Sequence, residues 1–302
     1  MPRITVFTPT FNRKNKLKIA FASLLKQTTH DFVWLIIDDG STDGTDQLIA
    51  KFQEEADFQI IYKWKENGGR HTAVNYSYDF LQTEYVVTLD SDDELLPDAI
   101  EKMLKTWDSI PQNQYNRFWC ISGREQYADT GEMVGKPYPQ NINDLQGREQ
   151  RKLILKCPGE KHCCRKVEIH KQYKFPVYPD TKFVTENIVW ERINRKYDQY
   201  CVNDCYGLYH TESTDSLSQN SPHKQTKFRS AYYRSLFYVN ELFDEFYFNK
   251  SVVICLIDLP RCAMKTSTKY SDVMNQLISP LRRMLVTLCY PIAWVLIHYR
   301  GK

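Results

Sequence analysis

The sequence predicts an α/β fold in which helices flank a Rossmann-like, mainly parallel sheet. Over residues 1–107, short β-branched or aromatic runs alternate with longer amphipathic stretches, which is the pattern of repeated strand–helix units. Residues 32–37 are too apolar for a strand that faces water, and they match a parallel strand buried on both faces. Clusters of Asp, Asn, Gly and Ser follow the apolar runs, so polar loops are expected where the strands end.

The first part of the chain is expected to contain four strands, each followed by an amphipathic helix. The expected strands are residues 4–7, 32–37, 59–64 and 85–89. The expected helices are residues 16–26, 45–52, 71–81 and 97–107. Because the carboxyl ends of parallel strands meet at one edge of a sheet, the loops after these strands are expected to form a common ligand-binding face.

The pattern weakens after residue 110. Residues 118–122 and 200–209 are expected to be strands, and residues 184–196 are expected to form a helix because apolar side chains recur there near helical spacing. Residues 211–227 are polar and are expected to form a surface loop or lid.

The composition indicates an ordinary globular protein in a reducing compartment. Of its 302 residues, 42% are hydrophobic and 25% are charged. The net charge of +3 is too small to attract nucleic acid, so no nucleic-acid partner is expected. The first ten residues lack the features of a secretory signal, so a cytoplasmic location and free thiols are expected. A zinc site built from Cys157, Cys163, Cys164, Cys201 and Cys205 stays an alternative, although none of them has Cys-x-x-Cys spacing.

An apolar run near the C-terminus, residues 284–297, has basic residues on both sides. Its 14 residues include a proline, and they fall short of the roughly 20 that span a bilayer. Segment 282–302 is therefore expected to make peripheral membrane contact, with Trp and Tyr at headgroup depth and the cations on anionic lipid. A C-terminal core helix is the alternative.

Three aspartates, Asp90, Asp92 and Asp93, directly follow the expected strand 85–89. Carboxylates this close raise one another's pKa unless a cation lies between them, and hard oxygen ligands suit Mg²⁺ or Mn²⁺. Such a cation would stabilise the charge that builds on a departing diphosphate. A solvated acidic cap of the next helix is the alternative, but it accounts for only one of the three.

Other polar residues that could hold a nucleotide also follow strands. Asp38 and Asp39 can accept a hydrogen bond from a base imide N–H. Asn67, Gly68 and Gly69 form a loop in which the two glycines allow the backbone to approach a phosphate or base, and Arg70 is a suitable partner for a diphosphate. Each of these features taken alone is also ordinary turn chemistry.

Four motifs in order resemble those of the family 2 glycosyltransferases. They are TPTFNR at 8–13, DDGSTDGT at 38–45, NGG at 67–69 and LDSDD at 89–93. The resemblance covers about residues 1–110 and extends thinly to about residue 215 through TEN at 185–187. It implies a GT-A fold, a UDP-sugar or other nucleotide-diphosphate sugar donor, a divalent cation at Asp-x-Asp, and inversion at the anomeric carbon.

The resemblance also implies roles for individual residues. Thr8, Asp39 and Arg70 would hold the nucleotide, and Phe11, where the family usually has Tyr, would still stack on the base. The expected ligands of Mn²⁺ or Mg²⁺ are Asp92 as the main ligand, with Asp90, Asp93 and His210, although a lone His is more often structural. The full set expected to bind the donor is Thr8, Thr10, Phe11, Asn12, Arg13, Asp38, Asp39, Asn67, Gly68, Gly69, Arg70, Asp90 and Ser91.

Glu186 is the expected catalytic base. Many members of the family carry Glu-Asp where this chain has Glu186-Asn187, and Asn cannot take a proton from an acceptor hydroxyl. Glu186 is the carboxylate that remains at this motif. Glu191, on the same expected helix, is a weaker alternative.

The motifs together predict a hexosyl- or N-acetylhexosaminyltransferase that transfers sugar to a lipid-linked or glycan acceptor in surface polysaccharide synthesis, at the inner face of the cell membrane. Residues 1–215 would form the GT-A domain, with a nucleotide-binding half at 1–110 and an acceptor half at 111–215, followed by a helical region at 216–302. A catalytically inactive nucleotide- or glycan-binding module is the alternative. A nucleotidyltransferase is disfavoured because the sequence has no Gly-rich N-terminal phosphate loop.

Overall fold

The computed structural model describes residues 1–210 and 224–299, and the chain divides into two compact units. The first unit comprises Met1–Phe175 and Val189–Ser213, and the second comprises Pro176–Ile188 and Thr214–Lys302. The second unit therefore includes one short segment from the middle of the chain. The expected domain boundary at residue 215 lies outside the described residues.

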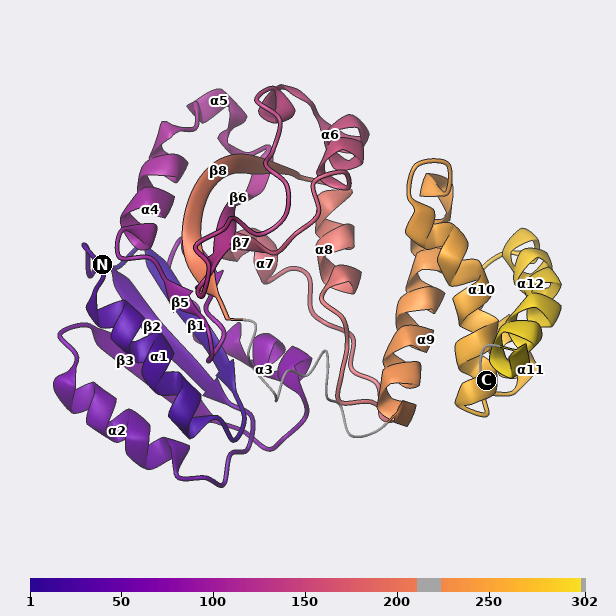
Figure 1. The fold of residues 1–302 in the computed structure, drawn as a ribbon, viewed down its shortest axis with the longest axis horizontal. Helices are drawn as coiled ribbons and strands as arrows, with labels where there is room; N and C mark the ends of the chain where they lie inside the picture. Colours follow the sequence, from indigo (N-terminus) through magenta and orange to yellow (C-terminus); the bar gives the residue numbers. More distant parts are fainter. Residues whose placement is uncertain (211–223, 300–302) are drawn as a thin grey trace. The chain divides into compact units, whose positions relative to one another are not determined.

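The first unit is built on a sheet whose first four strands are parallel. They are β1 (Ile4–Thr10), β2 (Phe32–Asp38), β3 (Gln59–Trp64) and β4 (Tyr85–Thr88), in the order β3-β2-β1-β4 (Figure 1). The helices that follow them are α1 (Lys14–Leu25), α2 (Thr45–Glu55), α3 (Arg70–Ser77) and α4 (Ala99–Ser109). The predicted α/β fold is confirmed, and these four strands end at one edge, where the polar motifs begin.

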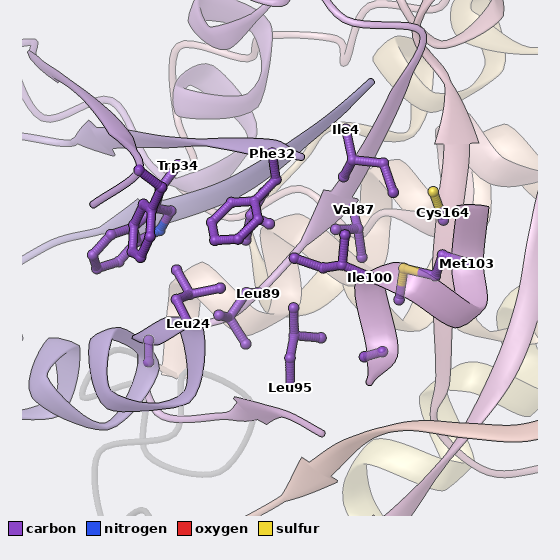
Figure 2. Packing of buried hydrophobic residues seen from close by; sticks show 14 of the residues in the cluster. Ile4, Leu24, Phe32, Trp34, Val87, Leu89, Leu95, Ile100, Met103 and Cys164 are labelled. Atoms are coloured by element: carbon purple, nitrogen blue, oxygen red, sulfur yellow. The ribbon is translucent and has the colours of Figure 1, made fainter. Parts of the chain in front are cut away.

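A continuous hydrophobic core explains why these residues form strands and helices. All seven residues of β2 are buried, so its apolar sequence FVWLIID has cover on both faces. Figure 2 shows Phe32 and Trp34 of β2 together with Leu24 of α1 in this core. Phe21 of α1 stacks on Phe52 of α2 with 3.9 Å between ring centroids. Because burial of each such side chain contributes about 1.5–3 kcal/mol, the core holds the strand ends in fixed positions.

The sheet continues through strands that run in both directions. β7 (Lys161–Lys166) is antiparallel to β4 and to β6 (Phe118–Tyr127), while β6 is parallel to β8 (Asp198–Tyr209). The short β5 (Glu94–Leu95) pairs antiparallel with β8 and so fixes the chain directly after the acidic motif. Shorter helices complete this part of the chain: α5 (Gln112–Tyr115), η1 (Ile142–Asp144), α6 (Gly147–Ile154), α7 (Val167–His170) and α8 (Asn187–Asn194).

The sequence of β7, KHCCRK, gives no strand signal because charged residues take the place of apolar ones. Its cations are buried against aromatic rings. The Arg165 guanidinium lies 5.1 Å from the centroid of Trp190, and Lys166 Nζ lies 3.3 Å from the centroid of Tyr115. Lys166 also donates to the Tyr115 carbonyl at 2.7 Å, and burial lowers the pKa of Lys166 to about 8.

Apart from the segment Pro176–Ile188, the described part of the second unit is mainly helical. Its helices are α9 (Lys224–Glu241), η2 (Phe243–Glu245), α10 (Lys250–Lys265), α11 (Tyr270–Gln276) and α12 (Pro280–Tyr299). Of the expected polar loop 211–227, residues 211–223 lie outside the described part of the chain. Residues 224–227 begin α9, so the prediction of a loop is wrong for them.

Among the described helices, α12 alone is long and apolar enough to cross a membrane by length and composition. The helix extends beyond the apolar run 284–297 at both ends and reaches 20 residues. Only 11% of its most apolar 18-residue window is buried, so the alternative of a core helix finds no support. The exposed apolar side chains form a stripe, here called the α12 stripe, that consists of Leu281, Met284, Leu288, Ile292 and Val295.

Candidate active site

Hydrogen bonds join the loops at the carboxyl ends of the parallel strands. Asn12, after β1, donates its backbone N–H to Ser41 Oγ at 2.8 Å. The Asn12 side-chain carbonyl accepts from Thr42 N–H at 2.8 Å. Asn12 has a φ of 51°, in the left-handed region that Asn tolerates better than most residues. The loop after β1 is thereby fixed against the loop after β2.

Asp38, which is expected to contact a nucleotide base, is a buried carboxylate with hydrogen-bond partners in the protein. It is 1% exposed, and its Oδ1 accepts from Ser41 N–H at 2.8 Å. Its Oδ2 accepts from the Tyr62 hydroxyl at 2.7 Å. Burial and the hydrogen bond to Asp38 raise the pKa of Tyr62, so the phenol stays protonated as the donor. Both Asp38 oxygens therefore have partners within the protein, and contact between Asp38 and a base stays a prediction.

Asp39 organises the glycine loop after β3. Its Oδ1 accepts from Lys65 Nζ at 2.6 Å and from Gly68 N–H at 3.0 Å. Its Oδ2 accepts from Gly69 N–H at 2.7 Å and from Asn67 Nδ2 at 3.2 Å. With only 5% of its side chain exposed, Asp39 holds this loop against the end of β2.

Three residues predicted from the TPTFNR motif differ in how accessible their side chains are. Thr8 is fully buried, and its hydroxyl donates to the Leu89 carbonyl at 2.8 Å while accepting from Trp34 Nε1 at 2.9 Å. The Thr8 hydroxyl is thus engaged within the protein, and the role of Thr8 in holding the nucleotide stays a prediction. Thr10 is also buried, and its hydroxyl has no hydrogen-bond partner among the described residues. Phe11 is 45% exposed, which leaves its ring accessible for stacking.

The acidic motif is paired with arginines from two other loops. Arg70 forms a bidentate pair with Asp90, with Nη1–Oδ2 and Nη2–Oδ1 distances of 3.1 and 2.8 Å. Arg13 Nη1 donates to Asp92 Oδ2 at 2.9 Å and lies 3.4 Å from Ser91 Oγ. The structure therefore brings together five of the predicted residues, which are two arginine–aspartate pairs and Ser91.

Asp93 is partly buried beside other carboxylates. Burial, together with the charges of nearby carboxylates, raises the pKa of Asp93 to about 8. One oxygen accepts from the backbone N–H of His210 at 3.4 Å. The His210 ring is turned to a different carboxylate, with Nε2 2.9 Å from Glu94 Oε1.

A ready metal centre is absent from the described residues, which contain no group of three His, Cys, Asp or Glu side chains arranged to hold an ion. The predicted ligands Asp90, Asp92, Asp93 and His210 are not assembled, because arginines and Glu94 take up three of them. The donor chemistry of Asp90 and Asp92 nevertheless fits a divalent cation. The side chains of Asp90 and Asp92 are 36% and 18% exposed. Each is paired with an arginine, and a guanidinium group also binds diphosphate.

Glu186 lies in the segment of the second unit that directly precedes α8, and Asn187 is the first residue of that helix. The alternative base, Glu191, accepts from Arg151 Nη2 at 2.8 Å. The side chains of this pair are only 15% and 10% exposed. A buried carboxylate paired with arginine is a poor base, which argues against Glu191, while Glu186 as the base stays a prediction.

The nine cysteines are free thiols, and most of them are buried. The described part of the chain contains no cluster of cysteines and histidines suited to zinc. The alternative of a structural zinc therefore finds no support.

Sequence reasoning missed two lysines at this edge. Lys16 Nζ lies 3.5 Å from Asp92 Oδ2 and adds a third cation to the acidic motif. Lys65 Nζ donates to Asp39 and also to Thr72 Oγ1 at 2.9 Å. Their position was the available signal, because Lys65 directly follows a strand and Lys16 lies in the first turn of the helix after β1.

The parallel strands, their flanking helices and the antiparallel continuation of the sheet form a GT-A fold. The chain belongs to glycosyl transferase family 2, whose family model matches residues 5–171. A curated relative, the GalNAc(5)-diNAcBac-PP-undecaprenol beta-1,3-glucosyltransferase of Campylobacter jejuni, is 33% identical over 110 residues, which are 35% of this chain and 34% of the relative.

Two solved structures support the fold. S. aureus TarS 1–349 in complex with UDP-GlcNAc has a TM-score of 0.63 and 15% identity, over 99% of this chain and 91% of that one. The mannosyltransferase PcManGT from Pyrobaculum calidifontis, in complex with GDP-Man and Mn²⁺, has a TM-score of 0.52 and 16% identity, over 100% and 88% of the two chains. The chain matches 11–41% of the length of the curated relatives compared.

Proposed function

We propose that this chain is an inverting, metal-dependent transferase that moves a hexosyl or N-acetylhexosaminyl group from a UDP-sugar to a lipid-linked or glycan acceptor. The observation that carries the proposal is the alternation of charge after β1, β3 and β4, where Arg13 is paired with Asp92 and Arg70 with Asp90. A diphosphate supplies the negative charge that the arginines need, and a divalent cation supplies the positive charge that the aspartates need. Both ligands can bind together without leaving a charge uncompensated.

The nucleoside is assigned to the loops after β1 and β3. Phe11 offers an exposed ring for stacking, and the Thr10 hydroxyl retains hydrogen-bonding capacity among the described residues. Asn12 and Asp39 shape these loops through their hydrogen bonds. The proposed donor site is therefore held rigid by residues that need not touch the donor themselves.

The proposed reaction is a displacement at the anomeric carbon. The oxygen of the acceptor hydroxyl forms a bond to that carbon, the bond from the carbon to the β-phosphate oxygen breaks, and its electron pair remains on UDP. The hydroxyl proton passes to the Glu186 carboxylate as general base. A divalent cation held by Asp90 and Asp92 would supply charge neutralisation at the diphosphate. Arg13 and Arg70 contribute the same stabilisation from the protein.

The α12 stripe supports an acceptor at a membrane surface. Leu288 is 63% exposed, and the exposed Arg283 provides a cation for anionic lipid. The name of the Campylobacter relative includes an undecaprenol-linked acceptor. We therefore assign catalysis in surface polysaccharide synthesis to residues 1–215. The region 216–302 is assigned to membrane association. Within it, segment 282–302 makes the peripheral contact at the inner face of the cell membrane.

Release of UDP tests the proposed function. Purified protein is incubated with UDP-GlcNAc, UDP-glucose or UDP-galactose and Mn²⁺, with water as the acceptor. Glu186→Gln should lower the rate at least about 100-fold, the lower range for loss of a general base, while UDP binding persists. Asn187→Asp is the matched control, because it adds a carboxylate beside Glu186 and should retain turnover. Binding without turnover, indifferent to Glu186→Gln, would instead identify a catalytically inactive module.

A further inference from the structure

The segment that carries Glu186, Pro176–Ile188, belongs to the helical second unit although its chain neighbours on both sides belong to the first. We propose that Arg229 and Tyr233 of α9 are positioning residues that hold this segment and thereby set the place of the base. The proposal rests on the proposed function of Glu186. It makes the helical unit a determinant of turnover as well as of membrane contact.

Tyr233 holds two residues of the segment at once. Its ring stacks on the ring of Tyr178, with centroids 3.6 Å apart and an angle of 4° between the planes. Its hydroxyl donates to Asp180 Oδ1 at 2.8 Å. Burial is the main cause that raises the pKa of Tyr233, and the hydrogen bond to Asp180 raises it further, so the phenol remains a donor throughout the neutral range.

Arg229 fastens the same aspartate to a second place in the helical unit. Its Nε lies 3.0 Å from Asp180 Oδ2. Its Nη1 donates to Thr268 Oγ1 at 2.8 Å, and its Nη2 donates to the Thr266 carbonyl at 3.1 Å, both in the loop between α10 and α11. All three guanidinium nitrogens are therefore used, and a lysine could not reproduce this planar set of donors.

The stretch between Asp180 and Glu186 is short and ordered. The Thr181 hydroxyl donates to the Phe183 carbonyl at 3.1 Å and accepts from its N–H at 3.2 Å. Val184 is buried, at 7% exposure. Since the chain here is turned on itself and packed, a displacement of Asp180 is expected to reach Glu186.

A general base must lie within hydrogen-bond reach of the proton it removes, so small displacements of Glu186 lower the rate steeply. The residues assigned to the donor, including Arg13 and Arg70, belong to the first unit. Loss of the contacts at Asp180 should therefore lower kcat and leave the KM for the donor nearly unchanged. A general loss of folding would change both, together with UDP binding.

The test compares Asp180→Ala, Tyr233→Phe, Arg229→Ala and Arg229→Lys with the wild type. The rate of UDP release is measured with Mn²⁺ and whichever of the three UDP-sugars the wild type hydrolyses fastest, and hydrogen exchange is measured over 176–188. Asp180→Ala and Arg229→Ala should lower kcat at least tenfold, change the donor KM less than twofold, and speed exchange in the segment. The kcat of Arg229→Lys should lie between that of Arg229→Ala and that of the wild type.

Arg234→Ala is the control, because it removes an arginine from the same helix whose partner, at 3.7 Å, is Asp258 of α10 instead of the segment. It should keep wild-type kcat. Normal kcat in Asp180→Ala and Arg229→Ala, with or without faster exchange, would overturn the inference alone. Full turnover in Glu186→Gln would overturn the assignment of the base, and the inference with it.

Discussion

At the scale of single residues, the aspartates after the strands have two different jobs. Asp38 and Asp39 accept hydrogen bonds from neighbouring loops and are almost fully buried. Asp43 accepts from Lys14 N–H at 3.0 Å and from Thr45 Oγ1 at 2.6 Å, and although burial opposes its charge, these hydrogen bonds lower the pKa of Asp43. Asp90 and Asp92 instead face arginine side chains. Asp38, Asp39 and Asp43 therefore fix the loops at this edge of the sheet. Asp90 and Asp92 place paired carboxylates there.

The buried pair of His162 and Glu125 predicts a pH dependence. His162 Nδ1 lies 2.8 Å from Glu125 Oε1, and although burial disfavours imidazolium, the hydrogen bond and charge of Glu125 raise the pKa of His162. The folded state then holds the proton more tightly than the unfolded state. The stability from this pair is therefore fully present below the unfolded pKa of about 6.5 and is lost as pH rises through the folded pKa.

An NMR titration of the histidine rings checks this directly. We expect a raised pKa for His162 in the wild type and a lower one in Glu125→Gln, where burial acts without the opposing charge. An unchanged pKa in the variant would mean that the carboxylate is not the cause.

At the scale of elements, the α12 stripe predicts binding to vesicles that contain anionic lipid. The pair of changes Leu288→Asp and Ile292→Asp should weaken that binding at least about tenfold, because two apolar contacts are replaced by charges that anionic lipid repels. Val253→Asp is the control, since Val253 is exposed on α10. Vesicle cosedimentation measures the effect. Undiminished binding of the double variant would remove the stripe from the membrane assignment.

Sequence periodicity predicts the strands of the parallel half of the sheet closely because they are apolar and alternate with amphipathic helices. The expected strand 59–64 coincides with β3. Helix ends are less predictable, and α1 begins at Lys14, two residues early, where Asp43 accepts the Lys14 N–H. β5 and β7 give no signal, because β5 exists through pairing with β8 and the cations of β7 are covered by distant aromatic rings.

The residues of the candidate site are also predictable only in part from the sequence. Arg13, Arg70, Asp90 and Asp92 are predicted as donor-binding or metal-binding residues because each follows a strand end, and the structure pairs Arg13 with Asp92 and Arg70 with Asp90. The direction of Thr8 could not be predicted, because it depends on hydrogen bonds to Leu89 and Trp34, which come from elsewhere in the chain.

At the scale of the whole molecule, the chain crosses between its two units more than once. The sheet unit contains the charged edge, while the segment with Glu186 is grouped with the helices. Donor binding and proton removal are therefore proposed to depend on different parts of the protein. Variants in the helical unit should separate the two processes, whereas variants at the acidic motif should affect donor binding itself.

The central claim is that Asp92 holds a divalent cation which in turn holds a diphosphate. Thermal unfolding with UDP, with and without Mn²⁺, tests it, since a ligand at one hundred times its Kd stabilises the native state by about 2.7 kcal/mol. We expect Mn²⁺ to enlarge the rise in Tm caused by UDP in the wild type and in the surface control Glu54→Ala, but not in Asp92→Ala. A Mn²⁺-dependent rise that persists in Asp92→Ala, or a wild type in which Mn²⁺ leaves the effect of UDP unchanged, would contradict it.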